Sequence, residues 1–251
     1  MNAQKTVPAY PLNMPADLRE LMENDPRVAA MPLAQGGRRR RDVLKAQDTP
    51  ASHDTRFAKL SLFNDDPFGE YKWINPPAGV YLSTDLGRGT GLRKINDTPV
   101  LYEAGPRPAQ RADIFTSGVL LVVSAPFLDI VKRFDAAAIE SLPVDWRFED
   151  QSRLDGYFYF DVTRQLDAFD YAHSEVRVLI DGESKRIDGL NFPRVLKSGI
   201  PSGVHLLRDS YLRSEILISV ELARALADAG MRGFTAVDQL SGNTIPLNYA
   251  N

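Results

Sequence analysis

The sequence predicts an α+β protein built on a mixed sheet, and three observations lead to this class. A strand–helix–strand pattern occurs twice in the C-terminal half. An aromatic and β-branched run between the two patterns is typical of a central strand. Short strands separated by Asp, Pro and Gly turns come before them and indicate a small antiparallel β region. With 251 residues and 43% apolar content, the chain is long enough for packed cores.

The first strand–helix–strand unit begins with the apolar run 119–123. Ser124 follows as a predicted N-cap, and Pro126 suits the first helical turn, where its missing N–H has no partner to lose. A strand near 141–148 is expected to complete the unit. The apolar stripe of the predicted helix consists of Phe127, Ile130, Val131 and Phe134.

The second unit repeats this order near the C-terminus. Residues 216–218 form its first predicted strand, Ser219 is the N-cap, Gly230 ends the helix and Phe234 begins the next strand. Because strand, cap and helix is a common combination, ancient duplication and convergence remain equally open. The apolar stripe of this helix consists of Leu222, Ala225, Leu226 and Ala229.

Further strands are expected between the two units. The aromatic run 157–162 is predicted to be a central strand. Residues 174–180 and 185–187 are predicted to form a hairpin, because Asp181-Gly182 between two such runs favours a tight turn.

The N-terminal residues predict an extended arm with one short helix, in which Leu18, Leu21 and Met22 recur at helical spacing. The basic run 38–41 is interpreted as a solvated loop. Candidate strands follow near 60–63, 79–83 and 100–102, and are expected to form a small antiparallel sheet. These features divide the chain into an arm at 1–56, a β-rich subdomain at 57–111 and an α+β domain at 112–251.

Residue types that carry metal or nucleophilic chemistry are sparse. The chain has no cysteine, and its three histidines lie far apart at positions 53, 173 and 205. The glycine-rich stretch 87–93 has the composition of a phosphate cradle, but it lacks the GK[ST] ending of a P-loop, so a mobile loop is favoured. We therefore predict no catalytic set, no metal site and no cofactor. The longest apolar run has five residues, which is too short to cross a membrane as a helix.

An acidic stretch runs from Asp145 to Asp170, with seven acidic residues against three arginines and a net charge of −4. It is interpreted either as a solvated, partly salt-bridged face or as a surface that steers a basic partner. The candidate partner-binding residues are Glu149, Asp150, Asp155, Asp167 and Asp170. As an alternative, Asp161, Asp167 and Asp170 could act as general acid and base, because neighbouring carboxylates drive their pKa values apart.

The stretch 157–174, YFYFDVTRQLDAFDYAHS, resembles a pattern of one family, the bacterial polymorphic-toxin immunity proteins numbered eleven, formerly a domain of unknown function. The residues that carry the resemblance there are Asp161, Val162, Arg164, Asp167, Ala168, Asp170 and Ser174. Further matches in the family's order are Val123-Ser124, Leu206-Leu207-Arg208, Ile218-Ser219, Gly230, Gly233 and Phe234. The resemblance covers about residues 114–240, and these motif residues look like scaffold residues.

This resemblance implies a non-enzymatic protein that binds and occludes a cognate toxin domain encoded beside it. Neither a nucleic acid nor a membrane is an expected partner, and a homodimer is left open. The lack of cysteine fits a cytoplasmic location. Two other functions stay open from the residues alone: a carboxylate-dependent hydrolase, and a nucleic-acid binder that uses the basic arm.

Overall fold

The computed structural model describes residues 14–34, 38–46, 48, 52–62, 71–76, 87–93, 95–104, 111–117 and 120–249. Helices in these ranges are α1 (Ala16–Asn24), α2 (Pro26–Ala30), α4 (Ala125–Asp135), the short 3₁₀ helix Ala136–Ala138 and α5 (Val220–Asp228). The strands are β1 (Arg40–Leu44), β2 (Phe57–Leu62), β3 (Tyr71–Trp73), β4 (Val100–Glu103), β5 (Ile114–Ser117), β6 (Leu120–Ser124), β7 (Ile139–Pro143), β8 (Asp145–Phe148), β9 (Arg153–Leu154), β10 (Tyr157–Val162), β11 (Gln165–Leu166), β12 (Phe169–Asp170), β13 (Glu175–Asp181), β14 (Ser184–Asn191), β15 (Val195–Leu196), β16 (Leu206–Asp209), β17 (Ile216–Ser219) and β18 (Phe234–Asp238). The strand expected at 79–83 lies outside the described residues.

The α+β class with a mixed sheet is confirmed, and the two predicted units lie in two sheets. One sheet, which we call the local sheet, has the strand order β5-β6-β10-β7. The other, which we call the shared sheet, has the order β11-β16-β17-β2-β18, with β11 parallel to β16. In each unit a hairpin leads into a helix that begins at a serine, and a last strand follows the helix. The last strand returns to the sheet of the hairpin, but one antiparallel strand lies between them. That inserted strand is β10 in the local sheet and β2, from far earlier in the chain, in the shared sheet.

The two serines cap their helices as predicted. Ser124 Oγ accepts a hydrogen bond from the Phe127 N–H at 3.4 Å, and Ser219 Oγ accepts one from the Leu222 N–H at 3.1 Å. The stripes of α4 and α5 then pack in one apolar cluster between the two sheets, which we call the helix cluster. Its buried members include Phe127, Ile130, Val131, Leu222 and Leu226, as expected.

Alternation along the strands places an apolar cluster on both faces of each sheet. In the shared sheet, Leu206, Ile216 and Ile218 face the helix cluster, whereas Leu207 and Leu217 belong to a second group, which we call the N-terminal cluster. In the local sheet, Leu121 and Val123 face the helix cluster, whereas the other face packs in a third group, which we call the tryptophan cluster. The buried members of the tryptophan cluster include Phe115, Leu120, Val122, Trp146 and Tyr159. Three clusters therefore lie in series, with the two sheets as the walls between them.

β10 is a central strand, as predicted. Its residue Phe160 pairs with Leu121 on β6 and with Ser141 on β7, so the strand has a partner on each side. Phe160 is buried and its ring meets Phe127 of α4 edge to face, with 6.4 Å between ring centroids.

The prediction of one strand near 141–148 is wrong, because the chain changes sheets at Val144. β7 ends at Pro143 in the local sheet, and β8 begins at Asp145 in the sheet β3-β4-β8-β9. The two expected strands within 57–103 that the structure describes, β2 and β4, lie in different sheets. β3 and β4 pair antiparallel, and β4 pairs parallel with β8, whereas β2 lies in the shared sheet.

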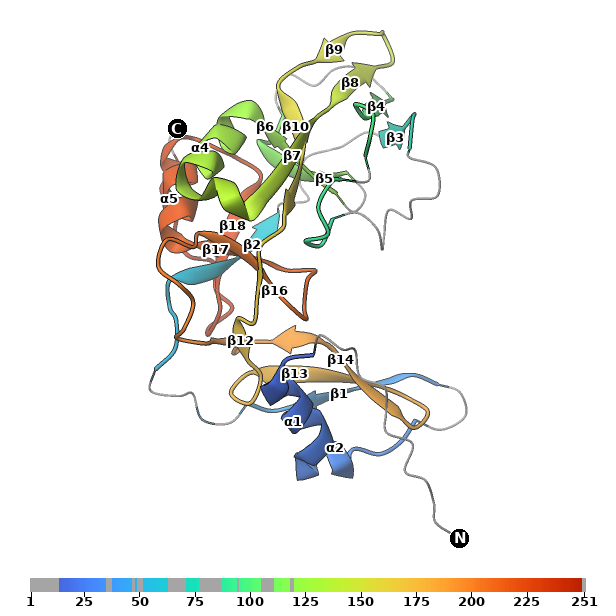
Figure 1. Cartoon of the computed structure of the whole chain (residues 1–251), viewed down its shortest axis with the longest axis vertical. Helices are drawn as coiled ribbons and strands as arrows, with labels where there is room; N and C mark the ends of the chain where they lie inside the picture. The colour runs from blue at the N-terminus through green and yellow to red at the C-terminus, as the bar shows by residue number, and fades with distance from the viewer. Residues whose placement is uncertain are drawn as a thin grey trace.

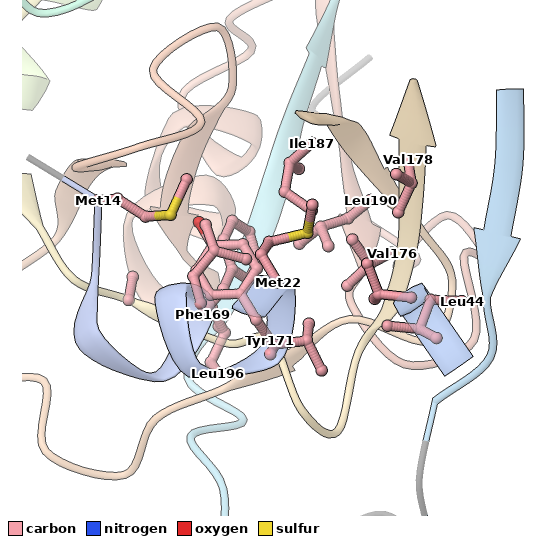
Figure 2. Close-up of a cluster of buried hydrophobic side chains, with 14 of the residues drawn as sticks. Met14, Met22, Leu44, Phe169, Tyr171, Val176, Val178, Ile187, Leu190 and Leu196 are labelled. Carbon is pink, nitrogen blue, oxygen red and sulfur yellow. The ribbon is translucent and has the colours of Figure 1, made fainter. Parts of the chain in front are cut away.

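The first described residues, 14–34, pack against the middle of the chain. The predicted helix is α1, and Leu18, Leu21 and Met22 are buried in the N-terminal cluster. Figure 2 shows Met22 among side chains from β12, β13 and β14. In Figure 1 these elements form the lower part of the molecule, with α4 and α5 side by side above them. The divisions drawn at residues 56 and 111 stay a prediction.

The basic run 38–41 is not simply a solvated loop, because β1 begins at Arg40. β1 pairs with β13 as the edge of the sheet β1-β13-β14. The Arg39 and Arg41 guanidinium groups lie 3.0 Å and 2.6 Å from the carboxylates of Asp181 and Asp188. The hairpin of β13 and β14 is confirmed, with Gly182 at φ +59° in its turn.

Candidate functional site

The five candidate partner-binding carboxylates lie in two separate places. Glu149 and Asp150 form the turn between β8 and β9, and Asp155 lies between β9 and β10. Asp167 and Asp170 lie just before and within β12. Figure 1 shows the hairpin of β8 and β9 at one end of the molecule and β12 in the lower part, so the five do not make one continuous surface.

The β8–β9 hairpin carries exposed acidic residues at its end. Glu149, Asp150 and Asp155 are all exposed, and Asp150 Oδ1 accepts the Ser152 N–H at 2.8 Å, which shapes the turn. Nearer the sheet, the Arg147 guanidinium hydrogen-bonds the Asp145 carboxylate and holds its pKa below the usual range. Glu149, Asp150 and Asp155 are therefore the exposed carboxylates at this end of the molecule.

Asp167 and Asp170 are bound by neighbouring side chains. Asp167 Oδ1 lies 2.7 Å from Lys197 Nζ, which also lies 3.0 Å from a carboxylate oxygen of Asp17. The Asp170 carboxylate lies 2.8 Å from His173 Nδ1 and accepts the His173 N–H at 3.3 Å. The Lys197 contacts join α1 to the segments around β12 and β15, whereas the Asp170 contact is local. All of them leave less negative charge for a partner than the sequence count implies.

Asp161 is fully buried and organises the glycine-rich stretch 87–93. One carboxylate oxygen accepts the Gly89 N–H at 3.1 Å and Arg208 Nη2 at 3.1 Å, and the other accepts the Gly91 N–H at 2.9 Å. The next amide, that of Leu92, donates to Glu140 Oε2 at 2.7 Å. The amides that suggested a phosphate cradle thus hold internal carboxylates, and the loop is tied to the local sheet through them.

The carboxylates of the alternative hydrolase do not share one set of contacts. Asp161 binds the glycine-rich loop and Arg208, Asp167 binds Lys197, and Asp170 binds His173. In the part of the chain that the structure describes, no group of three or more His, Asp and Glu side chains is arranged to hold a metal ion.

Arg164 and Ser174, two other motif residues, also make internal contacts. Arg164 forms an ion pair with the buried Asp135, whose carboxylate accepts the N–H groups of His205 and Leu206 at 2.8 Å and 3.2 Å. Ser174 donates to the Asp170 carbonyl at 2.7 Å and accepts the Val195 N–H at 2.9 Å. Arg164 thus joins the end of α4 to the segment after β10, and Ser174 joins β12 to β15.

The C-terminal motif closes α5 and brings the two units together. Gly230 has φ +74° and donates to the Ala227 carbonyl at 2.8 Å, which ends the helix. Gly233 has φ +105°, and a Cβ there would lie only 2.3 Å from the Ile114 carbonyl oxygen. Phe234 is buried against Phe127 with 6.1 Å between ring centroids. The buried motif residues Gly233 and Phe234 thus contact the first unit at Ile114 and Phe127.

Asp113 and Asp209 were missed from the sequence. Asp113 accepts the Ser124 hydroxyl at 2.7 Å and the Arg232 N–H at 2.9 Å, and so links the two units. Asp209 is buried and accepts the Tyr171 hydroxyl at 2.6 Å together with backbone N–H groups from two segments. The local sequence does not predict these contacts, because most of the partners lie far away in the sequence. The exceptions are the N–H groups of the turn that follows Asp209.

Two pockets open on the shared sheet. One of about 510 Å³ lies at the start of α5, where His205 Nδ1 is 2.9 Å from Ser219 Oγ. The other, of about 470 Å³, is lined by Lys59, Arg88 and Arg208 together with residues of both sheets.

A comparison with protein families gives a match that covers most of the chain. The model of the family described as Immunity protein family (Imm11) matches residues 45–240. A search of curated proteins finds no match. No helix among the described residues is long and apolar enough to cross a membrane.

Proposed function

Because the chain belongs to the Imm11 immunity protein family, we propose that it protects a cell by binding and neutralising a cognate toxin domain. The family match over residues 45–240 carries this proposal. In this proposal the protein acts in the cytoplasm and without catalysis. Its partner is the toxin domain encoded beside it. The separate partners of Asp161, Asp167 and Asp170 also favour a binding protein over a carboxylate hydrolase, which needs its two carboxylates in one cleft.

The binding surface that we propose is the exposed end of the β8–β9 hairpin and the turn after it. The motif residues Asp161, Ser174, Gly233 and Phe234 are buried, so a partner has to be recognised by other residues that reach the surface. Glu149, Asp150 and Asp155 do so at one end of the molecule (Figure 1). Carboxylates in that position would speed the encounter with a basic toxin and cover a basic catalytic surface.

The test reverses these three charges. A Glu149→Lys/Asp150→Lys/Asp155→Lys variant loses the hydrogen bond between Asp150 and Ser152 in the turn, but it should keep its overall fold because all three side chains are exposed. Its circular dichroism should match the wild type. Its association rate with the neighbouring toxin domain should fall by about tenfold at low salt. The salt dependence of that rate should fall as well, because it reports the charges that steer the encounter.

The matched control is Glu20→Lys/Glu23→Lys/Glu183→Lys, which makes the same change in net charge at exposed sites on α1 and in the β13–β14 turn. This variant should associate close to the wild-type rate and still protect cells that express the toxin. Equal effects of both triple variants would show that net charge alone matters and would overturn the proposed surface. A wild-type chain that neither binds nor protects would overturn the proposed function itself.

A further inference from the structure

The pocket of about 470 Å³ lies where the shared sheet meets the local sheet. The residues that line it include Lys59 and Leu60 of β2, Leu121 of β6, Glu215 beside β17 and Arg88 of the glycine-rich loop. The volume falls within the range of about 300–1,000 Å³ that is common for ligand sites. Polar and apolar residues both line it, as expected where a partner side chain is held by its stem and by its head group.

Three cationic side chains line this pocket, and two of them already have partners. Arg208 is 5% exposed and donates to Asp161, to the Val162 carbonyl at 3.0 Å and to the Arg213 carbonyl at 2.6 Å. Lys59 Nζ lies 3.5 Å from Glu215. Arg88 is exposed, and no ion pair involving it occurs among the described residues. Arg88 is thus the cation that is available to an incoming anion.

The backbone of Arg88 is in a conformation that arginine rarely adopts. Its φ is +54°, in the left-handed region, between Gly87 at +70° and Gly89 at +79°. Asp161 holds this turn in place through the amides of Gly89 and Gly91. A glycine at position 88 would adopt this conformation without strain, whereas an arginine there lowers the stability of the fold. Strained residues of this kind cluster at functional sites, which points to a role for the Arg88 side chain.

The charges in the pocket are also close enough to repel one another. Burial lowers the pKa of the Arg208 guanidinium, and the positive charge of Arg88 lowers it further, against the opposing effect of Asp161. An anion bound by Arg88 would offset the repulsion between Arg88 and Arg208. A guanidinium favours carboxylates because its parallel N–H groups match the two carboxylate oxygens.

We infer that this pocket is a second contact site for the toxin, in which Arg88 binds a carboxylate of an Asp or Glu side chain that the toxin inserts between the two sheets. This inference rests on the proposed function, and it adds a site of opposite charge to the acidic hairpin. Arg88 is the specificity-determining residue there, while Asp161 and Arg208 position the loop that presents it.

The test uses two substitutions that act differently on the fold. Arg88→Gln removes the charge, and Arg88→Gly removes the charge and the backbone strain together. Both should weaken binding of the neighbouring toxin domain by about tenfold or more in calorimetry. The melting temperature should stay unchanged for Arg88→Gln and should stay unchanged or rise for Arg88→Gly, so the loss cannot come from unfolding.

Arg93→Gln is the matched control, because Arg93 belongs to the same loop, is highly exposed and lies outside the pocket, 3.2 Å from Glu140. It should bind the toxin like the wild type. An Arg88→Glu variant should lose binding, and one Asp→Arg or Glu→Arg substitution in a scan of the toxin's surface should restore it. Wild-type affinity for both Arg88 variants, or an equal loss with Arg93→Gln, overturns this site alone. A wild type that does not bind the toxin overturns the proposed function and this site with it.

Discussion

Buried ionic residues fasten segments that are far apart in the sequence. Asp161 joins β10 to the glycine-rich loop and to Arg208 of β16. Arg111 and Glu103 form a buried pair beside Trp146, and the buried Arg194 forms an ion pair with the partly exposed Glu215. Removing one member of a buried pair leaves the other charge buried without a counter-charge. This lowers the free energy of unfolding far more than the loss of an exposed pair does.

Asp161→Ala should therefore lower the free energy of unfolding by about 3–5 kcal/mol. It leaves the Arg208 guanidinium and the amides of Gly89 and Gly91 without their shared acceptor. Urea denaturation followed by circular dichroism would measure the change. The matched control is Asp167→Ala, which removes an exposed carboxylate from its pair with Lys197 and should cost less than about 1 kcal/mol.

A second substitution tests whether the unpaired charge of Arg208 causes the loss of stability. Adding Arg208→Met to Asp161→Ala should recover part of the lost stability, because the guanidinium is no longer buried without a counter-charge. If Asp161→Ala unfolds at the wild-type urea concentration, the carboxylate does not hold the loop. The position of Arg88 would then need another explanation.

From sequence, the role of Asp161 was out of reach. A count of charges between 145 and 170 treats every carboxylate alike, yet Asp161 is buried whereas Glu149 and Asp150 are exposed. Gly89 and Arg208, which bind Asp161, lie 72 and 47 residues away from it in the sequence, and only the folded chain brings them together. The exposure of the hairpin turn could be expected, since turn chemistry is local.

Elements defined by local signals were predicted well. α4 and α5 follow from a serine cap and an apolar stripe, both contained within a few turns of chain. Sheet membership does not have this property, because pairing depends on strands elsewhere in the sequence. For this reason the break at Val144 between β7 and β8, and the insertion of β2 between β17 and β18, could not be derived from the residues alone.

The central place of β10 predicts a severe effect of proline within it. Phe160→Pro should cost at least about 3 kcal/mol, because it removes a ladder N–H from a strand with a partner on each side. It also removes an aromatic ring from the helix cluster. Thermal unfolding would show a much lower midpoint than for Phe160→Leu, the control that keeps the N–H. Equal midpoints for the two variants would place β10 at an edge.

Across the whole molecule, the three clusters are coupled through the sheets that separate them. The shared sheet presents Leu217 to the N-terminal cluster and Ile216 and Ile218 to the helix cluster. Loss of packing in one cluster destabilises the sheet beside it, and the cluster on the other face of that sheet is destabilised as well. We therefore expect the chain to unfold as one cooperative unit, although the sequence suggested three segments.

Leu18→Ala tests this coupling. The side chain is fully buried in the N-terminal cluster, so the change should cost about 2–5 kcal/mol. Trp73 and Trp146, the chain's two tryptophans, lie at the tryptophan cluster, beyond both sheets. Their fluorescence should nevertheless report the same lowered urea midpoint as circular dichroism.

The control for this prediction is Arg19→Ala, an exposed neighbour on α1, which should leave both midpoints near the wild-type value. If Leu18→Ala shifts the circular dichroism midpoint and leaves the fluorescence midpoint in place, the N-terminal part unfolds by itself. The divisions drawn from the sequence would then describe real folding units.

The position of β2 between β17 and β18 affects how the chain folds during its synthesis. Every strand of the local sheet lies between residues 114 and 162, so that sheet can close soon after Val162 leaves the ribosome. β2 is made earlier, but its partners begin only at Ile216 and Phe234. At roughly 5–20 residues per second, β2 waits on the order of ten seconds or more with both edges unpaired. The first strand of the shared sheet to be translated is thus incorporated among the last, and the nascent chain depends on its own local sheet until then.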